Sequence, residues 1–91
     1  MGHTLAARLI EEFSMSDTLI ELFAEVLEVD PSTLGDDSSP DTVARWDSLA
    51  AMHLVAAIEG KFDVKLTTKE IMKMMSIGLA RKTLRHKGVD V

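Results

Sequence analysis

Ser48 is the residue with the clearest setting for chemistry. It stands in the run Arg45-Trp46-Asp47-Ser48-Leu49, where a polar loop gives way to a segment with helical apolar spacing. Asp47 is a favoured N-cap residue, so we expect the hydroxyl of Ser48 in the first turn of a helix. The first N–H groups of a helix have no partner within it and the helix dipole is positive there. A phosphate ester on the serine oxygen would therefore be stabilised.

The other reactive side chains do not form a catalytic group. His53 follows Ser48 by five residues, about 140° around a helix, so its imidazole cannot take the proton of that hydroxyl. The three histidines, His3, His53 and His86, fall in different predicted elements, and no two are at metal-ligand spacing. The chain has no cysteine and no Gly-rich phosphate loop. We therefore predict no catalytic residue and no metal site.

The composition favours one small helical domain. The chain has 91 residues, of which 46% are hydrophobic and only 4% are aromatic. Such a composition suits helices better than sheets and one core better than two. No apolar run approaches the roughly 20 residues of a membrane span, and the N-terminus lacks the pattern of a secretory signal. The absence of cysteine fits a reducing compartment, and we expect a cytoplasmic monomer.

The charges are divided unevenly along the chain. Residues 1–47 hold two basic and eleven acidic side chains, whereas residues 48–91 hold eight basic and four acidic ones. The acidic half argues against a nucleic-acid binder that uses its whole surface. Attraction between two oppositely charged halves of a small bundle explains the division equally well.

Residues 16–29 predict the first helix of the domain. Ser16 or Asp17 is its expected cap. One face collects the apolar side chains Leu19, Ile20, Leu22, Phe23, Val26 and Leu27. Such a stripe requires a partner surface, which makes this a bundle helix. A further amphipathic helix is an option within residues 1–14, to which we assign no function.

A short turn and a long loop follow. Asp30-Pro31 is expected to start a single turn, and Leu34 to reach the core. Residues 35–47 are rich in turn-forming residues. A loop of this length is unusual in a small helical domain and is often functional. It would allow the helices on either side to run roughly parallel.

Residues 48–62 predict a second helix with two apolar faces. One face carries Ala51, Leu54, Val55, Ile58 and Phe62 and is expected in the core. Trp46, which precedes the cap, is expected to pack on Ala51 as a hydrophobic staple. Leu49, Met52 and Ala56 lie outside the core face, where a purely structural helix is usually polar.

Two shorter helices complete the domain. Thr67 and Glu70 have the spacing of a capping box and predict a short third helix after an extended link over residues 63–66. Ser76 is the expected cap of a fourth helix, which ends near Gly88. The last turns of this helix are basic, and their interaction with the helix dipole accounts for that.

With these elements in place, the chain resembles an acyl carrier protein over about residues 16–84. The central match is Trp46-Asp47-Ser48-Leu49 with the helix that follows. Family members share the Asp-Ser-Leu triplet, a leucine at the position of Leu54, and Glu-x-x-Phe at the position of Glu59 and Phe62. The segment with Thr67, Glu70, Ile71, Met74 and Ile77 also fits the family.

This resemblance implies an all-α fold, a four-helix acyl-carrier-like bundle with a long loop between helices 1 and 2 and a short third helix. It also implies a division of the chain. Residues 1–15 would be an N-terminal extension or a remnant of an expression tag, residues 16–88 the carrier domain, and residues 89–91 a tail.

The resemblance further implies how such a protein works. Ser48 would receive 4′-phosphopantetheine from coenzyme A through a separate phosphopantetheinyl transferase. The thiol of this arm would hold acyl or aminoacyl groups as thioesters, supplied by a loading enzyme and passed to a downstream synthase or transferase. The carrier itself would catalyse nothing. The docking surface for partners would include Asp47, Leu49, Met52, Ala56, Glu59 and Ile77, with Ala56 and Ile77 beside the acyl chain.

Two departures from fatty-acid carriers suggest a specialised pathway. Ala50, His53, Gly60 and Lys61 stand where such carriers commonly have acids, and Arg81 stands where an apolar residue is usual. The chain is therefore more similar to the discrete carriers of polyketide, nonribosomal peptide or modified-lipid assembly. We expect neither nucleic-acid binding nor a membrane span.

Two alternatives stay open. The fold could remain unmodified and act as an interaction subunit. A small helical module could instead bind a protein, a nucleic acid or an anionic membrane through its basic last helix, which carries Arg81, Lys82 and Arg85.

Overall fold

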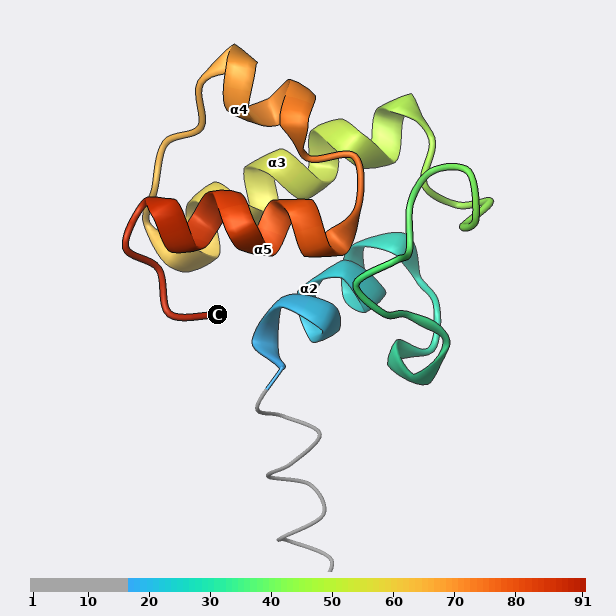
Figure 1. Cartoon of the computed structure of the whole chain (residues 1–91). Coiled ribbons are helices and arrows are strands. Elements are labelled where there is room, and N and C mark those ends of the chain that lie inside the picture. The colour runs from blue at the N-terminus through green and yellow to red at the C-terminus, as the bar shows by residue number, and fades with distance from the viewer. Residues whose placement is uncertain (1–16) are drawn as a thin grey trace, which may run out of the picture.

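The computed structural model describes residues 17–91, and in that range every regular element is helical (Figure 1). In chain order they are α2 (Thr18–Leu27), the 3-10 turn η1 (Pro31–Thr33), α3 (Ser48–Phe62), α4 (Thr68–Lys73) and α5 (Ile77–His86). This confirms the predicted all-α bundle with a long first loop and a short third helix. The optional helix within residues 1–14 lies outside the described residues.

The helices begin where local capping signals place them. In each case a side-chain oxygen accepts the backbone N–H three residues later, which satisfies one of the unpaired donors of the first turn. The four capping residues are Asp17, Asp47, Thr67 and Ser76. At α4 the capping box is complete, because the Glu70 carboxylate also accepts the N–H of Thr67.

One hydrophobic core joins α2, α3 and α5. Its buried members are Leu19, Ile20, Phe23, Leu27, Trp46, Leu54, Ile58, Ile77, Ala80 and Leu84. The helix α4 contributes no buried residue and lies against this core through the partly buried Met74. The expected tail also takes part, since Val89 and Val91 pack on the core.

Trp46 packs across the bundle. Its ring meets Phe23 of α2 edge to face, with ring centroids 5.2 Å apart and an angle of 62° between the planes. The expected partner, Ala51, lines the same small cavity of about 30 Å³ as Trp46. Anchoring by the larger aromatic side chain fixes the end of the loop directly before α3.

The loop before α3 does not serve to make the helices parallel. Figure 1 shows α3 and α5 running in the same direction and α2 running against them, so that prediction is wrong. The loop instead covers the start of α5. The carbonyl of Asp36 accepts the N–H of Gly78 at 2.9 Å, and the carbonyl of Ser38 accepts the N–H of Ile77 at 3.0 Å.

Arg81 of α5 links the loop to α2. Its guanidinium reaches both carboxylate oxygens of Asp17 at 3.0 and 3.1 Å, and one oxygen of Asp36 at 2.9 Å. One side chain of α5 thus ties the cap of α2 to the loop. Burial by itself lowers the pKa of Arg81, but its hydrogen bonds with Asp36 and Asp17 outweigh burial and raise the pKa above its ordinary value.

No helix within residues 17–91 is long and apolar enough to cross a membrane.

Candidate functional site

Ser48 is the first residue of α3, and its side chain is exposed. The preceding residue does the capping. The Asp47 carboxylate accepts the N–H of Ala50 at 2.8 Å, and the Asp47 carbonyl accepts the N–H of Ala51 at 2.9 Å. Within residues 17–91 the Ser48 hydroxyl makes no hydrogen bond, so its oxygen is available for modification.

The backbone beside this oxygen suits an anion. In the described part of the chain, the N–H groups of Ser48 and Leu49 donate to no protein acceptor, as expected for the start of a helix. They lie at the positive end of a helix of 15 residues. A phosphate ester on Ser48 would therefore meet unpaired N–H donors.

The position of Ser48 is fixed from inside the bundle. Trp46, two residues earlier, is only 5% exposed and belongs to the core, where its ring contacts Phe23. Its backbone N–H also donates to the carbonyl of Val43 at 3.0 Å. The serine thus follows closely after a residue that is anchored in the core, although the loop before it is irregular.

Two hollows lie along the first turns of α3. The first, of about 250 Å³, is apolar and runs between α3 and α4; its lining residues are Ala51, Met52, Val55 and Ile71. The second, of about 240 Å³, lies between the end of α2 and the start of α3. It is mixed in character, with Leu27, Glu28, Arg45, Asp47, Leu49 and His53 among its lining residues. Arg45 and Glu28 form an exposed ion pair at 3.2 Å beside it.

Four of the expected docking residues share one exposed surface. Asp47 caps α3, while Leu49 and Met52 are 62% and 70% exposed, and Ala56 is exposed one turn further along. Two large apolar side chains so near Ser48 have no structural role in the described bundle. We name Leu49, Met52 and Ala56 the α3 apolar face.

Glu59 and Ile77 lie elsewhere. The Glu59 carboxylate accepts the N–H of Leu66 at 2.9 Å and so holds the link that follows α3. Ile77 is 0% exposed and differs from the expectation of a docking residue, because its side chain is enclosed by the core and its N–H is covered by the loop. A partner cannot contact Ile77 directly in this conformation.

The basic last helix is largely committed to internal contacts. Arg81 binds Asp17 and Asp36, and the Arg85 guanidinium donates to the carbonyl of Val91 at 2.7 Å. Lys87 binds the Glu70 carboxylate at 2.9 and 3.0 Å. These contacts reduce the basic surface on which the alternative of binding through the last helix depends.

The Glu70 contacts also affect its acidity. The N–H of Thr67 and then the ammonium of Lys87 hold the pKa of Glu70 below its ordinary value. Sequence reasoning missed this pair and the Arg81 contacts, because the partners are distant in the chain. For the Arg81 contacts the only signal was the division of charge between an acidic first half and a basic second half, and the Glu70–Lys87 pair lies within the second half.

Two comparisons with known proteins cover most of the chain. A family model described as "Phosphopantetheine attachment site" matches residues 17–79, which include Ser48. A nonribosomal peptide synthetase, ungA of Aspergillus violaceofuscus, is 37% identical over 79 residues. That alignment covers 86% of this chain but only 1% of the synthetase.

Proposed function

Because this chain belongs to the phosphopantetheine attachment site family, whose members carry a covalent 4′-phosphopantetheine, we propose that Ser48 is the residue that bears the arm. The observation that carries the proposal is the exposed hydroxyl of Ser48 at the start of α3, which forms no hydrogen bond within residues 17–91. The family match, which spans residues 17–79, and the geometry of the start of α3 both support this stretch of the chain.

The residues around Ser48 fit such an arm. Asp47 caps the helix, so the serine oxygen is not used as the cap. The N–H groups of Ser48 and Leu49 would hold the phosphate. When attached, the arm supplies a thiol that holds the cargo as a thioester, and the chain has no thiol of its own.

The chain's own work is to position the arm and to present it. The apolar hollow between α3 and α4 begins within one turn of Ser48 and offers a surface for the arm and its cargo. The α3 apolar face offers a contact surface for the enzymes that act on the arm. The chain thus acts as a non-catalytic carrier, and a separate transferase, a loading enzyme and a downstream synthase or transferase act on it.

We further propose a specialised biosynthetic pathway, of the polyketide, nonribosomal peptide or modified-lipid kind. The similarity to a nonribosomal peptide synthetase supports this, although the chain spans only 1% of that protein. The charge of α3 supports it as well. Its one acid, Glu59, is hydrogen-bonded to the link at Leu66, so its exposed face is apolar instead of acidic.

Intact mass spectrometry tests the attachment site. The full chain is incubated with coenzyme A and a promiscuous phosphopantetheinyl transferase, and the mass is expected to rise by one arm. Ser48→Ala should abolish the increase. Ser32→Ala, an exposed serine in η1, is the matched control and should gain the arm normally. An arm that persists in Ser48→Ala, or no arm on the native chain, would refute the proposal.

A further inference from the structure

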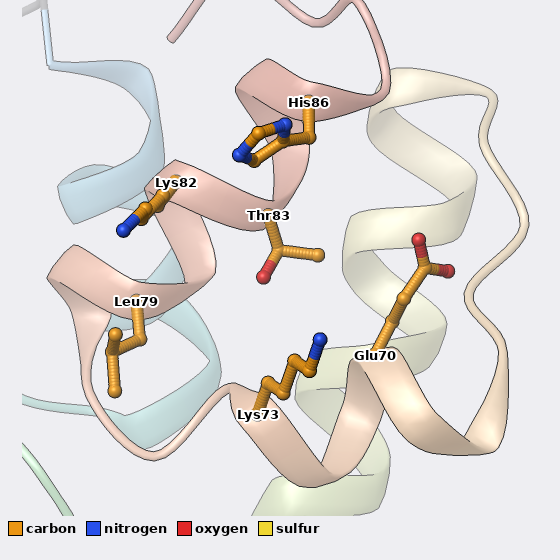
Figure 2. A pocket seen from close by; sticks show the side chains of 6 residues that line it. All are labelled: Glu70, Lys73, Leu79, Lys82, Thr83 and His86. Carbon is orange, nitrogen blue, oxygen red and sulfur yellow. The ribbon is translucent and has the colours of Figure 1, made fainter.

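A further hollow, of about 540 Å³, lies between α4 and α5, and none of the residues that line the two hollows near Ser48 lines it (Figure 2). It is lined by Glu70 and Lys73 of α4 and by Leu79, Lys82, Thr83 and His86 of α5. Figure 2 shows Lys73 and Thr83 facing each other across the space between the two helices. We name it the α4–α5 groove.

The unpaired charge of this groove is positive. Its one acid, Glu70, is already bound by Lys87 and by the N–H of Thr67. Lys73 and Lys82 are exposed, and within residues 17–91 neither forms an ion pair. Two lysines on opposite walls can therefore bind carboxylates without breaking an internal contact.

The groove also offers apolar contact and neutral hydrogen-bonding groups. Leu79 is 44% exposed although it belongs to the first turn of α5. The Thr83 hydroxyl and the His86 ring supply further polar atoms. A charged rim beside an exposed leucine is the pattern of a protein contact, in which apolar burial gives affinity and the charges select the partner.

We propose that the α4–α5 groove docks an acidic peptide segment of a partner protein, one with carboxylates on both sides of a leucine-like side chain. The hollow has room for a few side chains. An extended polyanion would also meet the rest of the chain, whose net charge is −5 and whose first half is acidic. A short peptide can be held by Lys73 and Lys82 alone, and exposed charges farther away than about 8 Å, the Debye length at physiological salt, are largely screened.

This site is separate from the proposed attachment site. The apolar hollow beside Ser48 uses Ile71 of α4, whereas the α4–α5 groove uses Glu70 and Lys73. A partner held in the groove would leave the α3 apolar face uncovered. The groove would then act as a tether while enzymes act at Ser48, and its occupancy does not depend on the arm.

Amide NMR on the ¹⁵N-labelled full chain tests the proposal. The probe is the peptide acetyl-Glu-Leu-Asp-Glu-Leu-Glu-amide, and the control is its uncharged counterpart with Gln and Asn. We expect saturable shifts confined to residues 70–86 with the acidic peptide alone. The variant Lys73→Glu/Lys82→Glu should weaken binding about tenfold or more, since it reverses both groove charges. Lys61→Glu, an exposed lysine of α3, is the matched control and should bind like the native chain.

Several outcomes would overturn the inference. These are no saturable shift, equal shifts with the uncharged peptide, or shifts centred on Leu49 and Met52. Binding of vesicles containing phosphatidylglycerol or of a DNA duplex, without peptide binding, would assign the groove to another class of ligand. If the groove signals shift with protein concentration in the absence of peptide, the groove binds a second copy of this chain. If the substitutions Glu11→Gln and Glu12→Gln shift the groove signals, the groove binds the chain's own N-terminal segment.

Discussion

Replacing Arg81 should loosen the bundle at the place where α2, the loop and α5 meet. Its side chain is only 12% exposed and binds Asp17 and Asp36, which lie 64 and 45 residues away in the chain. Its Nε atom is buried and has no hydrogen-bond partner within residues 17–91. The guanidinium is therefore bound on one side and unsatisfied on the other.

The expected loss can be worked out from these contacts. The two acids are 40% and 58% exposed, so each ion pair is discounted to about 0.5–1 kcal/mol. Arg81→Ala also removes a buried stem of methylene groups, worth roughly 0.8 kcal/mol each. The substitution also removes the buried, unsatisfied Nε atom, which reduces the loss of stability by about 1 kcal/mol. We expect the free energy of unfolding to fall by about 2 kcal/mol, or about 8–16 °C in melting temperature.

Arg81→Met separates the two contributions. Methionine keeps most of the buried stem and has no unsatisfied nitrogen, so the loss should be about 1 kcal/mol or less. Asp17→Asn together with Asp36→Asn completes a double-mutant cycle, and asparagine still caps α2. Urea unfolding followed by fluorescence gives each free energy, because Trp46 is the only tryptophan and is buried.

A native-like midpoint in Arg81→Ala would refute the assigned role of this side chain. The charge contribution would be refuted separately if the loss caused by Arg81→Met were the same in the Asp17→Asn/Asp36→Asn background as in the native one. In that case the stem would stabilise the bundle and the ion pairs would not.

Three further predictions concern local contacts. Because the pKa of Glu70 is lowered in the folded protein, its ionised carboxylate should stabilise the fold fully above about pH 4.3. This contribution should be lost as the pH falls through the lowered pKa. Glu70→Gln should therefore flatten the pH dependence of the free energy of urea unfolding in that range. Gly78→Ala should cost about 1–2 kcal/mol by the same assay, because the new Cβ would lie 3.1 Å from the carbonyl oxygen of Asp36. Gly60→Ala is its control, since that Cβ meets open space, and it should stabilise α3 by about 0.5–1 kcal/mol. Trp46→Ala should cost about 3–5 kcal/mol in circular-dichroism melts, and a loss below 1 kcal/mol would contradict its place in the core.

The sequence by itself determined the helices and the candidate serine. Each helix start depends on a side chain and a backbone N–H three residues apart, so the signals at Asp47, Thr67 and Ser76 could be read directly. The predicted bounds of α3 agree with the structure. The exposure of Leu49 and Met52 followed from helical periodicity alone.

Only the tertiary structure decided which distant groups meet. The dipole of the last helix already accounted for its basic residues, Arg81 among them. The sequence near Arg81 did not indicate Asp17 or Asp36 as its partners. The burial of Ile77 and the course of the loop depend on the same docking of the loop on α5. The α4–α5 groove likewise lies between two helices that are joined by the Glu70–Lys87 ion pair, a contact between residues 17 positions apart. Capping joins residues three positions apart, so the sequence shows it directly. Packing between helices joins residues far apart in the chain, and local sequence patterns do not show which of them come together.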